Sequence, residues 1–306
     1  MVQPSPFDRL IQDATQLANR DPVAAFARLD ELYGKSLTES DVLALGAFAV
    51  HLGTAALGRF AETAAFQKRL LTHPTVTEGS ATARSLWRGL AVVQRCAGDQ
   101  AGADEAVAKG VSNDSERCRL AIMGAQTLSA RAKHGEAIKE LQRATELVAR
   151  LPPNDEIVGQ TAAIATNLAR LAESQLRASR DLLVAAAEAG VAAWSRAPDW
   201  RGRHKALYHQ GNAYLMAADP TRALNVVQAM MELEDAHDAG PAERFHTAAL
   251  ACRCQVVRGQ VKIAAGALEA CRDFAKRVVG EGAKPVQASL EGLERFVEQG
   301  RRAAKG

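Results

Sequence analysis

Apolar residues recur at positions i, i+3, i+4 and i+7 along almost the whole chain. This spacing places apolar side chains on one face of a helix. Strands are disfavoured, because no run of residues alternates β-branched and polar side chains. The pattern therefore predicts an all-α protein with more than about 70% helix and no sheet.

Glycine, proline and helix-capping Asn, Asp or Ser residues interrupt the pattern at short intervals, and such residues end one helix or begin the next. The breaks lie at 19–22, 33–36, 57–59, 73–74, 97–99, 112–115, 134–135, 151–154, 197–199, 219–220, 239–241, 258–259 and 280–282. A further break with a weaker signal is predicted around Ala178 and Ser179. We expect roughly fifteen helices of about 12 to 20 residues, joined by links of about 2 to 6, which is the spacing of antiparallel helical hairpins.

Three of the predicted hairpins, 115–150, 200–236 and 241–279, repeat one series of small and large residues at the same offsets. The series are Ala125, Leu128, Ala137, Leu141 and Ala144, then Gly211, Tyr214, Ala223, Val227 and Met230, then Cys252, Gln255, Ala264, Leu268 and Cys271. We expect the second-helix alanine of each series to be buried at a close helix crossing. The earlier hairpins, 40–72 and 78–111, fit no single register well, and a last helix at about 285–302 is expected to cap the array.

This order of small residue, large residue three positions on, and alanine nine positions further resembles the tetratricopeptide repeat (TPR) family. Gly211 and Tyr214 match best, whereas Gln255, Ala125 and Cys252 depart from the family pattern. The resemblance implies an α-solenoid of stacked antiparallel hairpins, a TPR-like superhelix with degenerate repeats that forms a single array over 1–306. It also implies a concave groove, lined by the first helix of each hairpin, in which peptides or partner helices bind.

By family geometry the clearest repeat presents five partner-binding candidates to that groove: Lys205, Tyr208, His209, Asn212 and Met216. In peptide-binding relatives, lysine and asparagine on these helices hold a C-terminal carboxylate. Only Lys205 and Asn212 stand at suggestive positions here, so a complete clamp is not found. Ordinary solvated surface residues are the alternative interpretation. If the groove interpretation holds, replacing Lys205 by Glu and Asn212 by Ala weakens partner binding without touching the core.

Arg201 and Arg203 belong to the densest basic and aromatic segment, beside Trp194 and Trp200. Arginines at the start of a helix oppose the helix dipole, which favours a bound anion, and a tryptophan could stack on a nucleic-acid base. The alternative is a basic first helical turn next to two core tryptophans.

Composition narrows the function. The 306 residues include 38 basic and 35 acidic side chains and only 5% aromatics, too balanced a charge for a polyanion-binding protein. Five cysteines without a Cys-x-x-Cys pair predict free thiols in a reducing compartment.

The longest uninterrupted apolar run, 42–50, is short of the roughly 18 residues that span a bilayer, and the first residues do not resemble a signal peptide. We therefore expect a cytoplasmic protein without membrane insertion, and the alanine and arginine usage is typical of a GC-rich bacterial genome.

Motifs for catalysis or cofactor binding are not recognisable. The segment 34–36, Gly-Lys-Ser, ends like a phosphate-binding loop but lacks the earlier glycine and the preceding strand, so it is interpreted as a helix end. No His-Glu-x-x-His motif and no cysteine pair at zinc spacing occur. The acidic segment 232–238, near His246, is interpreted as a solvated helix end rather than a cation site. The sequence predicts no enzyme activity, cofactor or metal.

The leading hypothesis is a non-enzymatic protein–protein interaction scaffold or adaptor that binds a peptide or partner protein in its concave groove. Identity of the partner, pathway and oligomeric state are left open by the sequence. A regulator that senses a peptide or small ligand through the pitch of its superhelix is the first alternative. A nucleic-acid-binding helical repeat is the second, and the near-neutral charge and few aromatics disfavour it.

Overall fold

The computed structural model describes residues 6–174 and 179–303. Helix makes up 81% of the protein, and the described residues contain no strand, so the predicted all-α class is confirmed. The chain divides into two compact units, 1–150 and 151–306. The finer expectation, one TPR-like array over 1–306, stays a prediction.

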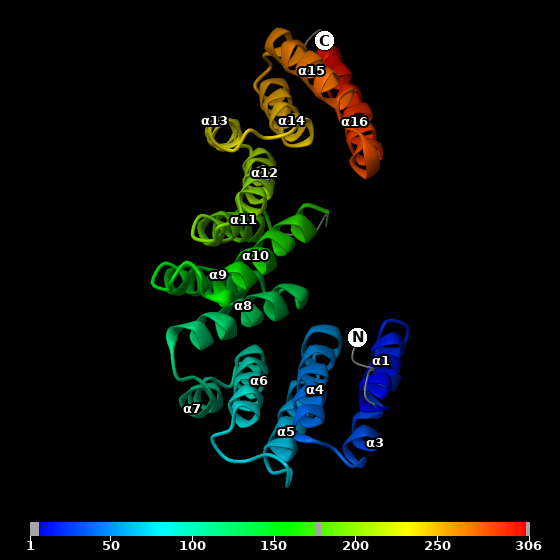
Figure 1. The fold of residues 1–306 in the computed structure, drawn as a ribbon, viewed down its shortest axis with the longest axis vertical. Coiled ribbons are helices and arrows are strands. Elements are labelled where there is room, and N and C mark those ends of the chain that lie inside the picture. The colour runs from blue at the N-terminus through cyan, green and yellow to red at the C-terminus, as the bar shows by residue number, and fades with distance from the viewer. Residues whose placement is uncertain (1–5, 175–178, 304–306) are drawn as a thin grey trace. The chain divides into compact units, whose positions relative to one another are not determined.

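Unit 1 consists of helices that pair along the chain (Figure 1). Its elements are α1 (Pro6–Ala18), α2 (Pro22–Ala27), α3 (Leu29–Tyr33), α4 (Glu39–Val50), the π-helix η1 (His51–Leu57), α5 (Phe60–Leu71), α6 (Ala81–Ala97), α7 (Gln100–Gly110), α8 (Asp114–Ala130) and α9 (His134–Val148). Neighbours α6 and α7 form one antiparallel hairpin and α8 and α9 the next, while α4 with η1 pairs with α5. The first helices also contact one another in order, α4 with α6 and α6 with α8.

Unit 2 repeats this arrangement (Figure 1). Its elements are α10 (Glu156–Ser174), α11 (Arg180–Trp194), α12 (Trp200–Met216), α13 (Pro220–Ala236), α14 (Pro241–Val257), α15 (Val261–Ala275), the short 3-10 helix η2 (Gly280–Gly282) and α16 (Ala283–Ala303). The first helices α10, α12 and α14 contact in sequence, and α16 packs on both α14 and α15 through Val286, Leu290, Leu293 and Val297. The helix predicted at about 285–302 is therefore present and covers the last hairpin.

Helix ends fall at the predicted breaks because the capping residues act as expected. Side chains of Asn113, Asp199 and Asp219 accept backbone N–H groups in the first turns of α8, α12 and α13. Ser179 caps α11 in the same way, although Ala178, the other residue of that predicted break, lies outside the described residues. Between α2 and α3 the chain turns at Arg28, whose backbone is helical. This break was not predicted, because no glycine or proline stands there.

The repeat positions are buried as predicted. Ala137, Ala223 and Ala264 each have 0% exposure, and the last residues of the three series, Ala144, Met230 and Cys271, are equally buried. The predicted burial of the three second-helix alanines is therefore confirmed. The assignment of the three hairpins to TPR-like repeats stays a prediction.

A shared backbone turn ends the first helix of each of these hairpins. Seven positions after the first small residue, Ala132, Ala218 and Gly259 adopt the left-handed conformation, with φ of 56°, 61° and 72°. The next backbone N–H then donates to the carbonyl of the repeat's larger residue, at 2.9, 2.8 and 2.8 Å for Leu128, Tyr214 and Gln255. This is the Schellman arrangement that closes a helix C-terminus.

The same turn places the hairpin 78–111 in register, contrary to the expectation that it fits none. Gly98 has φ of 85°, and the N–H of the following residue donates to the Gln94 carbonyl at 2.9 Å. Counting from this turn, Ala91 and Ala103 take the small-residue positions and both have 0% exposure. At the larger-residue position this hairpin carries Gln94, a polar residue like Gln255 of the hairpin 241–279, whereas Leu128 and Tyr214 stand there in the other two.

In the hairpin 40–72 the π-helix η1 shifts the register of the first helix by one residue. Its closing bond runs from the N–H of Arg59 to the carbonyl of Gly53, at 2.7 Å, and spans one residue more than in the other hairpins. A π-helix inserts one residue into a helix. The first helix therefore loses the register, while the second helix keeps it with Thr63, Gln67 and Leu70 at 0% exposure.

The continuous helical stretch Glu39–Leu57, formed by α4 and η1, is long and apolar enough to cross a membrane by length and composition alone. Half of its most apolar window is buried inside the protein, where Val42, Leu45 and Leu52 join the core of unit 1. Apolar residues of this helix thus have a packing role in the folded chain.

Candidate functional site

The five residues predicted to bind a partner lie on α12, the middle of the three stacked first helices of unit 2. Lys205 is exposed, Met216 is 43% exposed, and Tyr208 is half-buried. His209 and Asn212 are buried, at 7% and 8% exposure, because α10 and α14 flank α12 on either side. Only part of the predicted set is thus directly presented to solvent.

Asn212 has a partner within the protein. Its Oδ1 accepts a hydrogen bond from Nη1 of Arg253 on α14 at 3.0 Å, and the same nitrogen lies 3.3 Å from the Tyr208 hydroxyl. The expectation that Asn212→Ala touches no core atom is wrong, because this amide is buried and holds a neighbouring helix's side chain in place.

Arg253 is the cation of this cluster, and sequence analysis missed it. The side chain is half-buried, and within residues 6–174 and 179–303 no carboxylate lies within 4.0 Å of it. Among the described residues only Nη1 bonds to protein, which leaves the Nε and Nη2 edge for another acceptor. A signal did exist, since Arg253 follows Cys252 as Asn212 follows Gly211, at the same place in successive repeats.

Histidines surround Tyr208. Nδ1 of His209 lies 2.8 Å from Oε2 of Glu173 on α10, and the Tyr208 ring contacts the rings of His209 and His246, with centroids 5.8 and 5.2 Å apart. Burial lowers the pKa of His246 most, and nearby positive groups, Arg253 among them, lower it further. The side chains contacting Tyr208 and Asn212 thus come from α12 and α14, and Glu173 of α10 reaches the cluster through His209. We call Lys205, Tyr208, His209, Asn212, His246 and Arg253 the first-helix face.

A fully buried polar triad lies close to this face. Nε2 of His204 is 2.8 Å from Oε1 of Glu234 and 3.2 Å from Oγ1 of Thr247, and the Thr247 hydroxyl donates to the same carboxylate oxygen. All three side chains are at most 4% exposed. Glu234 therefore does not belong to a solvated helix end, as its segment 232–238 was expected to. Within the described part of the chain no group of His, Cys, Asp and Glu is arranged to hold a metal ion.

Arg201 and Arg203, the predicted anion-binding pair, have different surroundings in the structure. Nε of Arg201 lies 3.3 Å from Oε1 of Glu243, and its guanidinium stacks over Trp200, whose other contact is a parallel stack with His237. Nε of Arg203 is buried without a hydrogen-bond partner in the described structure. The Arg201 charge is thus paired with Glu243, and the Trp200 ring is stacked on Arg201 and His237.

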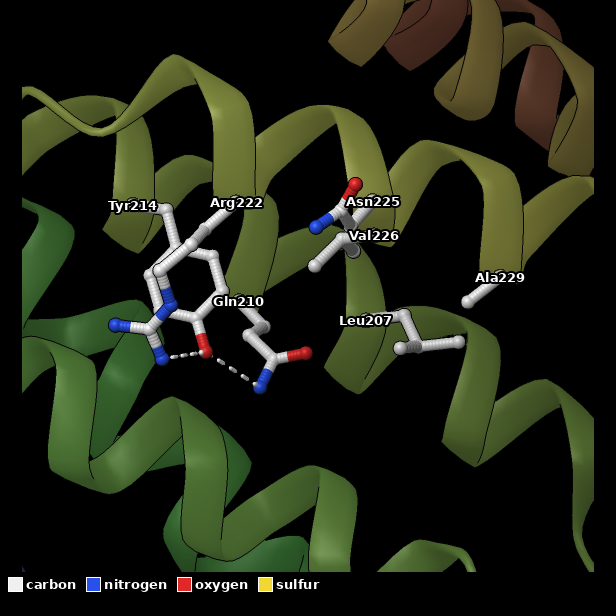
Figure 2. A pocket seen from close by; sticks show the side chains of 7 residues that line it. All are labelled: Leu207, Gln210, Tyr214, Arg222, Asn225, Val226 and Ala229. Atoms are coloured by element: carbon white, nitrogen blue, oxygen red, sulfur yellow. Dashed lines mark hydrogen bonds between the residues drawn. The ribbon is translucent and has the colours of Figure 1, made fainter.

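On another side of α12, a cavity of about 280 Å³ lies between α12 and α13 (Figure 2). The Tyr214 hydroxyl at its end donates to Glu188 at 2.9 Å and accepts from Arg222 at 2.7 Å and Gln210 at 3.2 Å. Burial, followed by the Glu188 carboxylate, raises the pKa of Tyr214 to about 12. The phenol therefore stays neutral and fully hydrogen-bonded, which suits a structural role for this repeat position.

The cysteine thiols lie inside the protein. All five cysteines are buried, and the structure shows no disulfide among them. Burial raises the pKa of Cys96, Cys252 and Cys254 to about 11 and that of Cys271 to about 12. A thiol that stays protonated near neutral pH is a weak nucleophile and a poor metal ligand.

Comparison with known proteins leaves the family open. No protein-family model matches the chain, and no curated protein matches it. Among solved structures, BtubC (BKLC) from P. vanneervenii is similar at 17% sequence identity, over 76% of this chain and 89% of that chain, with a TM-score of 0.35.

Proposed function

We propose that this protein is a non-enzymatic interaction scaffold or adaptor, and that the first-helix face of unit 2 binds an acidic segment of a partner protein or peptide. The stacking of α10, α12 and α14 supports it, because consecutive first helices form one extended surface in helical-repeat proteins. The finer interpretation of the hairpins as a TPR-like superhelix belongs to the same proposal.

Arg253 is the observation that carries the proposal. A half-buried guanidinium normally has a carboxylate partner, because taking its charge out of water is costly. Here two neutral groups, Tyr208 and Asn212, position it through one nitrogen. The remaining edge matches a carboxylate in the two-bond geometry that arginine forms with such groups.

The surroundings of Arg253 extend this anion-binding chemistry. Lys205, exposed one turn before Tyr208 on α12, adds a second positive charge, and the Tyr208 phenol adds apolar area with a polar tip. Together they fit a segment that contributes one buried carboxylate and further acidic or aromatic side chains. Met216 offers exposed apolar area at the far end of the same helix.

The proposal is tested by using the full chain as bait in extracts of its source cell and measuring the affinity of each captured protein. Arg253→Glu should weaken binding by at least about tenfold, because it replaces the anion-binding group by a like charge. Lys205→Glu should have a smaller effect, about two- to fivefold, since its charge is exposed and screened.

Lys262→Glu is the matched control, because it makes the same change of charge on the exposed side of α15. A partner that binds wild type and this control equally but loses affinity for Arg253→Glu locates the site on the first-helix face. A partner insensitive to Arg253→Glu, with the variant's circular dichroism unchanged, contradicts the proposal. Recovery of nucleic acid in a salt-sensitive manner would instead support the nucleic-acid alternative.

A further inference from the structure

A second candidate site lies in unit 1, in a cavity of about 570 Å³. Its walls come from the end of α5, the following loop, the first turns of α6 and the end of α7. The volume falls within the roughly 300 to 1,000 Å³ that small-molecule pockets occupy. The loop is held in shape by bonds such as that from the Val76 N–H to the His73 carbonyl at 2.9 Å, and Gly79 turns it with φ of 73°.

Positive charge dominates the lining. Lys68, Arg84 and Lys109 face the cavity, against the single carboxylate of Glu78. Arg84 donates to the Gly79 carbonyl, and Lys68 has no ion-pair partner in the part of the chain that the structure describes. Lys109 bonds to Glu105, outside the lining, at 2.7 Å. This bond chiefly lowers the pKa of the Glu105 carboxyl, and the charge of Lys68 contributes as well.

An aromatic ring completes the cavity. Trp87 is half-buried, Lys109 lies over its ring with Nζ 4.6 Å from the centroid, and its indole N–H has no hydrogen-bond partner in the described structure. The α6 backbone around Trp87 packs closely against the end of α7 at Gly110. A Cβ atom added there would come within 2.6 Å of the Trp87 Cβ and 2.9 Å of the Arg88 backbone nitrogen. Leu71, Val76 and Ala83 supply further apolar lining.

We propose that this cavity binds a small organic anion with an aromatic ring system, whose ring packs against Trp87 and whose acidic group lies between Lys68, Arg84 and Lys109. Two features of the cavity lead to the two parts of this ligand, the acidic group and the ring. Its net positive charge selects against a neutral ring, and the half-exposed indole with its apolar neighbours favours a ring over a simple inorganic anion. A carboxylate, a sulfonate and a phosphate ester all carry this chemistry.

The test uses the dye 8-anilinonaphthalene-1-sulfonate and its uncharged analogue N-phenyl-1-naphthylamine, which share one ring system and differ by the acidic group. The dye should bind the full chain with energy transfer from tryptophan, and at least about tenfold more tightly than the analogue. Lys68→Glu with Lys109→Glu should weaken dye binding by at least about tenfold, because both exposed side chains lose attraction and gain repulsion. Trp87→Leu should weaken it and reduce the energy transfer.

Lys35→Glu with Lys139→Glu is the control, because it makes the same charge change at exposed lysines outside the cavity lining. It should leave dye affinity within about twofold of wild type. Three results would each overturn the proposal. The dye binds Lys68→Glu with Lys109→Glu as tightly as wild type, its affinity falls equally in the control, or the uncharged analogue binds wild type as tightly as the dye. Circular dichroism of each variant shows whether a loss of binding reflects a loss of fold. Lys68→Glu with Lys109→Glu should keep the fold, because both lysine side chains are exposed.

Discussion

Ala223 shows how a single small residue determines helix packing. It has no exposed surface, and α13 crosses its neighbours at this point. Ala223→Leu should lower the free energy of unfolding by about 1 to 3 kcal/mol, because a larger side chain overpacks the crossing. Ala163→Leu, at an exposed position of α10, should change it by less than about 0.5 kcal/mol. Urea unfolding followed by circular dichroism measures both, and equal midpoints for the two variants would show that the crossing is not tight.

His246 predicts a pH dependence whose sign follows from its burial. Its pKa in the folded protein lies below the ordinary value of 6.5, chiefly because burial disfavours the charged ring. The unfolded chain therefore binds a proton more readily, so this residue's contribution to stability is present above about pH 6.5 and is lost as pH falls below it. His246→Phe keeps a ring beside Tyr208 without a titrating group. The fall in urea midpoint from about pH 7.5 to about pH 5.5 should be smaller in this variant than in wild type. An equal fall in both would exclude His246 as a source.

Residues at the candidate site were only partly predictable. Helix periodicity placed Lys205, Tyr208 and Asn212 on one face, and the structure confirms that their helix lies between two other first helices. Periodicity within one helix could not predict that Asn212 is buried, because burial depends on where the neighbouring helix lies. It also could not pair Arg253 with Tyr208, since these two residues stand 45 positions apart in the chain and meet only because α12 and α14 stack.

At the scale of elements, the left-handed turn is the most regular feature of the hairpins, and it makes a prediction about residue choice. Glycine adopts positive φ without strain, whereas alanine there costs about 1 kcal/mol. Ala218→Gly should therefore stabilise the protein by up to about 1 kcal/mol, and Gly259→Ala should destabilise it by a similar amount. Ala163→Gly, inside a helix, should instead cost about 0.5 to 1 kcal/mol. If Ala218→Gly destabilises as much as Ala163→Gly does, the turn is not left-handed in solution.

Glycines inside helices predict opposite effects of an added methyl group, depending on whether neighbouring atoms leave space for it. Gly110→Ala should destabilise by about 1 to 3 kcal/mol, because the added Cβ would meet the Arg88 nitrogen and the Arg84 carbonyl oxygen, which are backbone atoms and cannot rotate away. Gly266→Ala in α15 should stabilise by about 0.5 to 1 kcal/mol, since nothing lies within 4 Å of the new Cβ and alanine favours helix. Thermal unfolding compares the two, and shifts of the same sign would contradict this account of α6 and α7.

Element boundaries were predictable where a residue type acts through local chemistry, as the caps Asp199 and Asp219 do. They were not predictable where the chain leaves the regular pattern without such a residue. The π-helix η1 contains Gly53 but no residue before Gly58 that ends the helix, so a count based on 3.6 residues per turn does not reveal its extra residue. That single residue is the reason why the hairpin 40–72 seemed to have no register.

At the scale of the whole molecule, buried residues of the described chain form clusters that are local in the sequence. One cluster lies within 7–86, and two others lie within 207–254 and 245–297. Each joins helices that are near neighbours in the chain, which is typical of helical repeats. This locality also explains how sequence periodicity could predict the class and the hairpins, while the two compact units could not be derived from it.

The division into units predicts that residues 151–306 fold without residues 1–150. Two of the buried clusters and all six residues of the first-helix face belong to this part of the chain. A fragment with its own core should unfold cooperatively. We expect the fragment 151–306 to give a helical circular dichroism spectrum and a sigmoidal urea transition. Ala223→Leu should destabilise the fragment as much as the full chain, within about 0.5 kcal/mol, because its contacts lie inside the unit. A fragment that lacks a cooperative transition, or in which Ala223→Leu has no effect, would show that the hairpins of unit 2 need the rest of the chain to pack.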